Sequence, residues 1–145
     1  MFLSADQLAA HLVGDYLLQS HWMAQNKTKA CWPAFCHAFI YSLPFLWLAW
    51  SAPNAALAMA VILSTHFLID RFRLARYVVW AKNFIAPYRI YDPEREMRVI
   101  TNPPWSICTA TGYPPDRPAW LAVWLLIIAD NTLHLAINYV ALRWL

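Results

Sequence analysis

The amino-acid sequence predicts an all-α integral membrane protein, a four-helix bundle with a proline-rich cytoplasmic cap between helices three and four. Hydrophobic residues make up 61% of the 145 residues and charged residues only 13%, whereas soluble domains are about 45–50% apolar and about 25% charged. The apolar residues also gather into segments that approach the roughly 20 residues needed to cross a bilayer core. The excess apolar surface needs a bilayer or a large partner, and the length fits a single membrane domain over residues 1–145.

The first two helices are expected at about residues 4–24 and 32–50. The first is long enough to span but carries Asp, Gln and His side chains along its length, so a re-entrant or interfacial placement is the alternative to a full crossing. The second has Trp32 and Trp50 at its ends, where aromatic side chains anchor helices at membrane interfaces. Pro44 is expected to kink the second helix, which membrane helices tolerate.

The last two helices are expected at about residues 54–86 and 118–145. The third begins after the break "SAPN" and crosses as far as Asp70. It then continues as an amphipathic extension, "RFRLARYVVWAKNFI", along the membrane surface. The fourth is the long apolar stretch that starts at Pro118. Residues 88–117, between them, are too rich in proline for another span and form the expected cap.

The basic residues set the orientation of these helices. Ten of the 11 Lys and Arg residues lie in two regions, between the first and second helices and between the third and fourth. Cytoplasmic loops carry such an excess of positive charge. We therefore expect a multi-pass protein of the bacterial inner membrane with both basic loops cytoplasmic and both termini periplasmic.

Each expected helix carries a pair of polar or ionisable residues spaced four apart, which places both on one face. Ionisable groups inside a membrane are costly, so they normally face the bundle interior or a water-filled cavity. Most of the pairs fall in the cytoplasmic half of their helices, which predicts one shared polar site near that membrane face. The pairs are His11 with Asp15, His37 with Tyr41, His66 with Asp70, and Asp130 with His134, the last extended to Asn138.

Imidazoles and carboxylates on facing helices favour a divalent metal, with zinc or manganese expected first. A bound metal would activate water for hydrolysis at neutral pH. One of the carboxylates Asp15, Asp70 and Asp130 could instead remain free as a general base. The expected ligands are His11, Asp15, His66, Asp70, Asp130 and His134. Around them, the expected supporting residues are His37, Tyr41 and Asn138.

Arg71 and Arg73 follow the third pair directly and would rim the entrance of the site, where guanidinium groups suit a phosphate. The favoured function is therefore metal-dependent hydrolysis of a phosphoester or lipid-like substrate. The expected partners are the lipid bilayer and an anionic, phosphate-bearing substrate. No nucleic-acid partner is expected, and a bundle of this size is compatible with a homo-oligomer.

Three other interpretations fit the same residues. Polar pairs in membrane helices also act as interhelical hydrogen bonds, worth about 1 kcal/mol each. The same side chains could bind a translocated ion or relay protons in a transporter. A non-enzymatic phage or bacterial membrane factor would instead use the cap, residues 88–117, to act on a host partner.

Four stretches carry a resemblance to a known family: "HLVGDYLLQSHWMAQNKT", "HAFIYSLPF", "THFLIDRFR" and "GYPPDRPAWLAVWLLIIADNTLHLAINYVAL". Together they resemble an uncharacterised family of small multi-pass membrane proteins from bacteria and their phages, catalogued as a domain of unknown function. The resemblance covers nearly the whole chain and implies a small helical membrane protein without supplying a reaction. More loosely, the His/Asp pattern is similar to membrane-bound metal-dependent hydrolases.

The distribution of basic residues predicts the result of a topology experiment. A reporter fused after Leu145 should be periplasmic, and one inserted near Asn102 should be cytoplasmic, because positively charged loops stay inside. Paired alkaline phosphatase and fluorescent-protein fusions measure this. Reporters that both lie on the same side would contradict the four-span arrangement.

Overall fold

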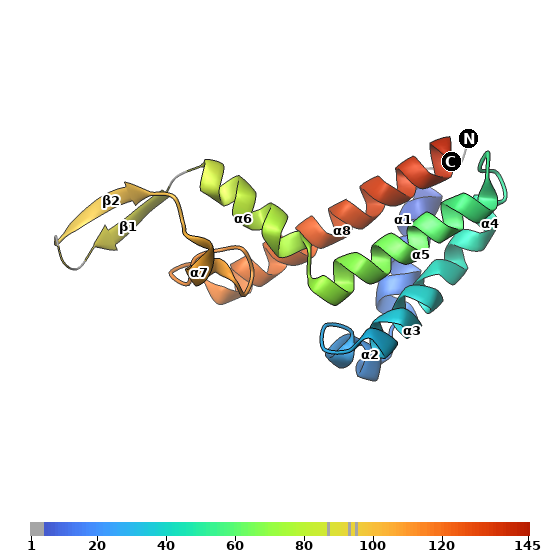
Figure 1. The fold of residues 1–145 in the computed structure, drawn as a ribbon, viewed down its shortest axis with the longest axis horizontal. Helices are drawn as coiled ribbons and strands as arrows, with labels where there is room; N and C mark the ends of the chain where they lie inside the picture. Colours follow the sequence, from blue (N-terminus) through green and yellow to red (C-terminus); the bar gives the residue numbers. More distant parts are fainter. Residues whose placement is uncertain (1–4, 87, 93, 95) are drawn as a thin grey trace. The chain divides into compact units, whose positions relative to one another are not determined.

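The computed structural model describes residues 5–86, 88–92, 94 and 96–145. The chain divides into two compact units, one formed by the residues up to Arg73 together with Asn131–Leu145, the other by Leu74–Asp130. Helices make up most of the first unit and are the main secondary structure of the second (Figure 1), so the expected all-α class is confirmed at that level. One short hairpin is the only strand pairing in the part of the chain that the structure describes.

The first unit begins with a broken helix. The α-helix α1 (Ala5–Leu12) passes directly into a π-helical turn, η1 (Val13–Leu17). The chain then leaves the helical conformation until α2 (His21–Asn26), where the Ser20 side chain accepts a hydrogen bond from the Met23 backbone N–H at 3.3 Å. The continuous helix expected over residues 4–24 is therefore interrupted, because this N-cap starts a new helix.

The next segment is one long helical stretch with a local tightening. It runs through α3 (Cys31–Ser42), the 3₁₀ turn η2 (Leu43–Phe45) and α4 (Leu46–Ala49). Pro44 lies within η2. Proline has no backbone N–H and cannot continue the α-helical hydrogen-bond ladder, so the helix tightens into a 3₁₀ turn at the residue where a kink is expected.

Two further long helices follow. α5 (Ala55–Phe72) starts at Asn54, whose side chain accepts a hydrogen bond from the Leu57 backbone N–H, and ends at Arg73 in the left-handed conformation (φ 52°). The single helix expected over residues 54–86 is thus two helices, since a left-handed residue terminates an α-helix. α8 (Ala119–Trp144) is continuous and contributes its residues from Asn131 onward to the first unit.

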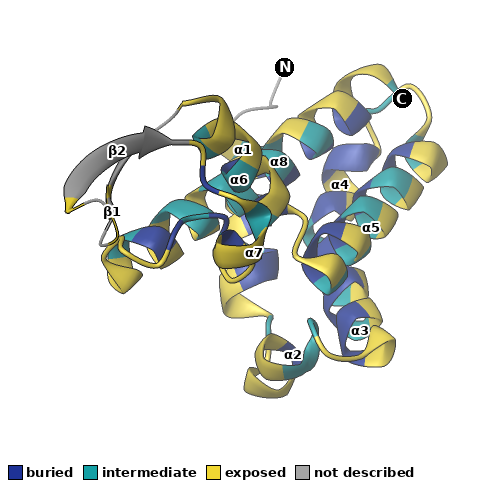
Figure 2. Cartoon of the chain, turned by 60° about the vertical axis from the view of Figure 1, so that its left-hand side comes forward, coloured by how far each residue is buried: buried dark blue, intermediate teal, exposed yellow. Residues whose placement is uncertain are grey.

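Among the described residues, three helices are long and apolar enough to cross a membrane: Cys31–Ala49, Ala55–Phe72 and Ala119–Trp144. The N-terminal segment is not one of them, so four crossings are not confirmed. Large apolar side chains remain exposed along these helices, and Figure 2 shows exposed residues recurring along α3 and α5. Trp47 is 67% exposed and Trp50 89%. An exposed apolar surface of this extent suits a lipid environment.

The core of the first unit joins α1, α3, α4, α5 and the end of α8. α3 packs along α5, and α1 packs against η2. The buried apolar residues that form this core are Ala10, Tyr41, Phe45, Leu48, Ala49, Ala58, Ile62, Ala141 and Leu142. Small residues on several helices allow their backbones to approach closely, as is common in membrane helix packing.

Gly14, in η1, marks the closest of these approaches. A Cβ atom at this position would lie 2.7 Å from Tyr41 Cδ2 and 2.9 Å from the Tyr41 carbonyl oxygen. Any side chain would therefore push η1 away from α3. Glycine is needed here for space, and its position fixes how near the following residue, Asp15, can come to α3.

The second unit contains α6 (Ala75–Ile85), the antiparallel strands β1 (Tyr88–Asp92) and β2 (Met97–Thr101), the short helix α7 (Trp105–Cys108) and the first part of α8. The Trp80 indole N–H donates to the Pro103 carbonyl at 2.9 Å, and the Tyr77 ring stacks on Trp105 with centroids 4.6 Å apart. The hairpin and α7 thus occupy the segment expected as the cap. The single domain and the cytoplasmic location of the cap stay predictions.

Gly14→Ala should destabilise the first unit, because the added methyl group overlaps the Tyr41 backbone and ring. Overpacking of this kind costs about 1–3 kcal/mol. Thermal unfolding of the purified protein in detergent measures the effect. Ala9→Ser is the control, because it adds one heavy atom at an exposed position of α1. Equal unfolding temperatures for the two variants would contradict the close approach.

Candidate metal centre

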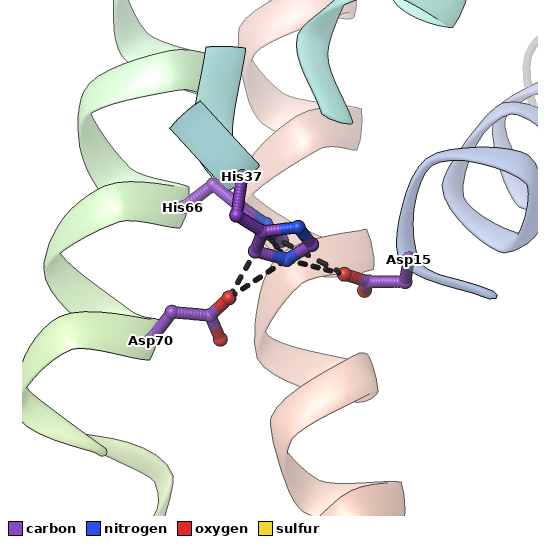
Figure 3. A group of neighbouring side chains, drawn as sticks. All are labelled: Asp15, His37, His66 and Asp70. Carbon is purple, nitrogen blue, oxygen red and sulfur yellow. Dashed lines mark hydrogen bonds and ion pairs between the residues drawn. The ribbon is translucent and has the colours of Figure 1, made fainter. Parts of the chain in front are cut away.

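Four buried side chains from three elements meet at one place in the first unit (Figure 3). η1 supplies Asp15, α3 supplies His37, and α5 supplies both His66 and Asp70. The two histidines are at most 1% exposed and the two carboxylates at most 10%. We call these four residues the buried cluster.

One ligand atom from each member of the buried cluster lies within 4.8 Å of the others. His37 Nε2 lies 3.1 Å from Asp15 Oδ1, 3.0 Å from Asp70 Oδ2 and 3.0 Å from His66 Nε2. His66 Nε2 lies 3.2 Å from Asp70 Oδ2 and 3.5 Å from Asp15 Oδ1. Ligand atoms around a tetrahedral zinc ion, bound at about 2.0–2.1 Å, are separated by roughly 3.3–3.4 Å. The buried cluster could therefore hold a metal ion.

The contact between the two imidazoles supports the same conclusion. A neutral imidazole has one N–H and one lone pair, so two facing Nε2 atoms form a hydrogen bond only if one of them is protonated. At 3.0 Å, with carboxylate oxygens at similar distances from both, the two nitrogens are arranged as common ligands of one cation. A metal would accept both lone pairs and leave the protons on Nδ1.

Ring packing, and not a hydrogen bond at Nδ1, fixes how these imidazoles are turned. Metal-binding histidines usually donate their second nitrogen to an acceptor. Within the described ranges, however, the Nδ1 atoms of His37 and His66 have no such partner. Instead the Tyr41 ring stacks on His66 with centroids 3.5 Å apart and an interplanar angle of 12°. The His66 ring also packs against the His134 ring, with centroids 4.2 Å apart.

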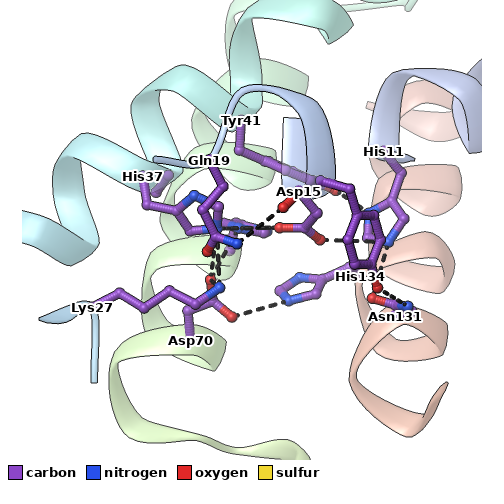
Figure 4. Close-up of polar contacts among 12 residues, drawn as sticks. His11, Asp15, Gln19, Lys27, His37, Tyr41, Asp70, Asn131 and His134 are labelled. Carbon is purple, nitrogen blue, oxygen red and sulfur yellow. Dashed lines mark hydrogen bonds and ion pairs between the residues drawn. The ribbon is translucent and has the colours of Figure 1, made fainter. Parts of the chain in front are cut away.

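A second layer of polar side chains surrounds the carboxylates (Figure 4). His134 Nε2 lies 3.6 Å from Asp70 Oδ1, and His11 Nε2 lies 3.5 Å from Asp15 Oδ2. These two histidines, expected as ligands, contact the outward oxygens of the carboxylates. The other two carboxylate oxygens, Asp15 Oδ1 and Asp70 Oδ2, face His37 and His66. The second layer thus orients the carboxylates of the buried cluster.

Tyr41 connects this second layer to α1 and α8. The Asn138 amide donates to the Tyr41 hydroxyl at 2.6 Å, and His11 Nδ1 lies 2.8 Å from the same oxygen. Because Tyr41 already accepts from Asn138, the tyrosine O–H is assigned as donor to His11 Nδ1. His11 Nε2 then carries a proton and donates to the Asn131 side-chain oxygen Oδ1 at 3.3 Å. Tyr41 and Asn138, the expected supporting residues, thus contact each other in this second layer, and their roles around a metal stay predictions.

Lys27 reaches the buried cluster from the turn after α2. Its ammonium lies 2.8 Å from Asp70 Oδ2 and 3.2 Å from His37 Nε2. The side chain is 20% exposed, more than any member of the buried cluster. The turn itself is held by Arg71, whose guanidinium donates to the Thr28 carbonyl at 2.9 Å. Lys27 therefore stands between the buried cluster and the exterior of the first unit.

The remaining expected site residues lie outside the buried cluster. Asp130 is half-buried on α8, four residues before His134, and is the last residue of the second unit. Arg73 is exposed at the end of α5. Arg71 lies 5.4 Å from the Phe72 ring centroid in addition to binding Thr28. Their roles as ligand, base or anion-binding groups stay predictions.

Two residues lie closer to the centre of the site than the sequence predicts. The sequence predicts only a supporting role for His37, since its partner at spacing four is a tyrosine, yet His37 Nε2 lies within 3.1 Å of a polar atom of each other member of the buried cluster. The other is Lys27, which the sequence predicts only as one of the basic residues that set the membrane orientation. Its proximity depends on the turn after α2, for which the sequence carries no periodic signal.

One comparison with known proteins supports the resemblance to an uncharacterised family. The model of the family described as "Protein of unknown function (DUF3307)" matches residues 3–91, and the chain belongs to this family. The match includes all four residues of the buried cluster and Lys27. Neither the comparison with curated proteins nor the one with solved structures found a match.

Tyr41→Phe should destabilise the first unit, because it removes the hydroxyl that His11 and Asn138 both contact in the interior. Withdrawing a buried hydrogen-bond partner costs about 1–3 kcal/mol. Tyr16→Phe is the matched control, since the Tyr16 hydroxyl accepts from Asn131 but its side chain is 54% exposed and water can replace it. Chemical unfolding in detergent compares them, and a larger loss for Tyr16→Phe would refute the buried network.

Proposed function

Since the family to which the chain belongs has no assigned function, we propose one from the buried cluster: a metal-dependent membrane hydrolase that acts on a phosphoester or lipid-like substrate. The observation that carries the proposal is the set of five ligand-atom separations between 3.0 and 3.5 Å. Interhelical hydrogen bonding alone requires pairs of polar groups. It does not require four ligand atoms to converge on one point.

Zinc or manganese fits the donor set best. The converging atoms are two imidazole nitrogens and two carboxylate oxygens, which suit both metals. No thiol joins them, because Cys31 is exposed, Cys36 is not among the converging residues and Cys108 belongs to the second unit. Soft metals that select thiolates are therefore disfavoured.

The hydrolytic step needs an accessible position and a base. A divalent metal in the buried cluster would lower the pKa of a bound water and supply the nucleophile. A tetrahedral site with four protein ligands is closed, whereas catalytic zinc sites have three. We assign Asp70, with His37 and His66, to the metal, because Asp70 contacts both imidazoles at 3.0 and 3.2 Å. Asp15, on the separate element η1 and slightly more exposed, then accepts the proton as general base.

A multi-pass arrangement in the bacterial inner membrane is part of the same proposal. His37 lies six residues into α3 and Asp70 two residues before the end of α5. At about 1.5 Å per residue, both are within roughly 10 Å of the helix ends that flank the basic turn of Lys27 and Lys29. The positive-inside rule puts this turn in the cytoplasm. The buried cluster would thus open toward the cytoplasm and its soluble or headgroup substrates.

A proton or ion relay is the second candidate. It is favoured by the continuity of the polar contacts, which run from Lys27 through Asp70 to His134, and from Asp15 through His11 to Tyr41. Chains of titratable groups of this kind occur in pumps and transporters. A relay needs no stoichiometric metal, so metal content separates the two functions.

His66→Ala should yield folded protein with strongly reduced metal content, because it removes one of two converging imidazoles. The wild-type protein, purified in detergent without chelators, should contain zinc or manganese in stoichiometric amount by elemental analysis. His21→Ala is the matched control, since His21 is exposed on α2 and outside the buried cluster. Wild-type protein without bound metal would contradict the hydrolase and favour the relay.

The assignment of the two carboxylates extends this test. Asp70→Asn should lose metal, whereas Asp15→Asn should retain most of it and lose hydrolysis of a chromogenic phosphodiester. Full hydrolytic activity in Asp15→Asn would contradict its role as base.

A further inference from the structure

Lys27 lies where a cation belongs in the buried cluster. Its ammonium contacts Asp70 Oδ2 at 2.8 Å and His37 Nε2 at 3.2 Å, and both atoms are members of the converging set. A metal bound through these two atoms would have to remove the ammonium from them, because each atom's inward lone pair can serve only one cation. Lysine and metal are therefore competitors for the same oxygen and nitrogen.

The Lys27 side chain can leave the buried cluster without a change in the backbone. Lys27 directly follows α2, in a turn anchored by the hydrogen bond from Arg71 to Thr28. Its side chain is already 20% exposed, and a lysine has four flexible methylene groups between backbone and charge. The ammonium can therefore swing outward while the turn stays in place.

The charge of the site changes sign in the same step. The two carboxylates and the Lys27 ammonium have a formal sum of −1, and a bound dication would change it to +1. Repulsion from the dication drives the ammonium away from Asp70, and the outward ammonium and the metal together attract an anion. Lysine commonly binds phosphate as a point charge with three donors.

We propose that Lys27 is a built-in cation that occupies the metal-free buried cluster, and that metal binding displaces its ammonium to the mouth of the site, where it binds the phosphate group of the substrate. This inference rests on the proposed metal-dependent function and assigns its anion-binding residue. Lys27 thereby links the two ligands, since phosphate is held only after the metal is in place.

Metal affinity tests the displacement. In Lys27→Gln the competitor is gone, so full-length protein in detergent should bind Zn²⁺ about tenfold tighter or more, the scale of one lost hydrogen bond to a charged group. A chelator competition titration measures this. Lys27→Met repeats the neutralisation with a side chain of similar length, in case the first variant does not fold. Lys29→Gln, exposed in the same turn, is the matched control and should behave as wild type.

Phosphate binding tests the second half. The probe is inorganic phosphate, observed by ³¹P relaxation with the Mn²⁺-loaded protein, because a phosphate near the manganese relaxes faster. Wild type and Lys29→Gln should show a saturable enhancement, and Lys27→Gln should lose most of it despite tighter metal binding. Lys27→Arg keeps the charge and should retain it. A structural role for Lys27 alone would weaken metal and phosphate binding together.

The outcomes separate this inference from the function on which it rests. If no protein of the series binds metal, the proposed hydrolase fails and the inference fails with it. If all bind metal, but the neutral Lys27 variants bind it no more tightly than wild type, only the displacement is overturned. Unchanged phosphate relaxation in Lys27→Gln would overturn the assignment of Lys27 as the anion-binding residue.

Discussion

Two buried carboxylates on neighbouring elements, Asp15 and Asp70, set the constraint on which the first unit depends. Moving like charges out of water together is costly unless cations or donors compensate them. Three kinds of group compensate these charges: two imidazoles between the carboxylates, the partly exposed ammonium of Lys27, and a second layer of polar side chains. The inner oxygens of the carboxylates face His37, His66 and Lys27, while the outer oxygens face His11 and His134.

The local backbone irregularities of the first unit follow from this constraint. η1 widens the N-terminal helix at the turn that carries Asp15, and π-helical turns often occur at functional sites. Gly14 lets that turn touch the backbone of α3 at Tyr41. The break before α2 then returns the chain so that Lys27 can reach Asp70. A regular helix over this segment would suit a membrane span better, but it would not carry Lys27 to the mouth of the buried cluster.

The sequence predicted the helical class and much of the buried cluster for a physical reason. A spacing of four residues on an apolar helix places two polar groups on one face, and burial forces such faces inward, as His66 with Asp70 illustrates. The place of His37 in the buried cluster depends on which helix α3 packs against. That packing is tertiary structure, for which the local sequence carries no signal. The contact of Lys27 depends on a short turn, and the hairpin of β1 and β2 lies in a segment whose prolines concealed its strand pattern.

In the proposed function, the imidazoles of His37 and His66 hold a single metal ion together with carboxylate oxygen. X-ray absorption spectroscopy of the zinc-loaded, full-length protein examines this site itself. We expect a first shell of nitrogen and oxygen atoms at about 2.0–2.1 Å, with the outer-shell scattering of two imidazole rings, and the loss of one ring in His66→Ala. A first shell of water oxygens without imidazole scattering, or a spectrum unchanged in His66→Ala, would contradict it.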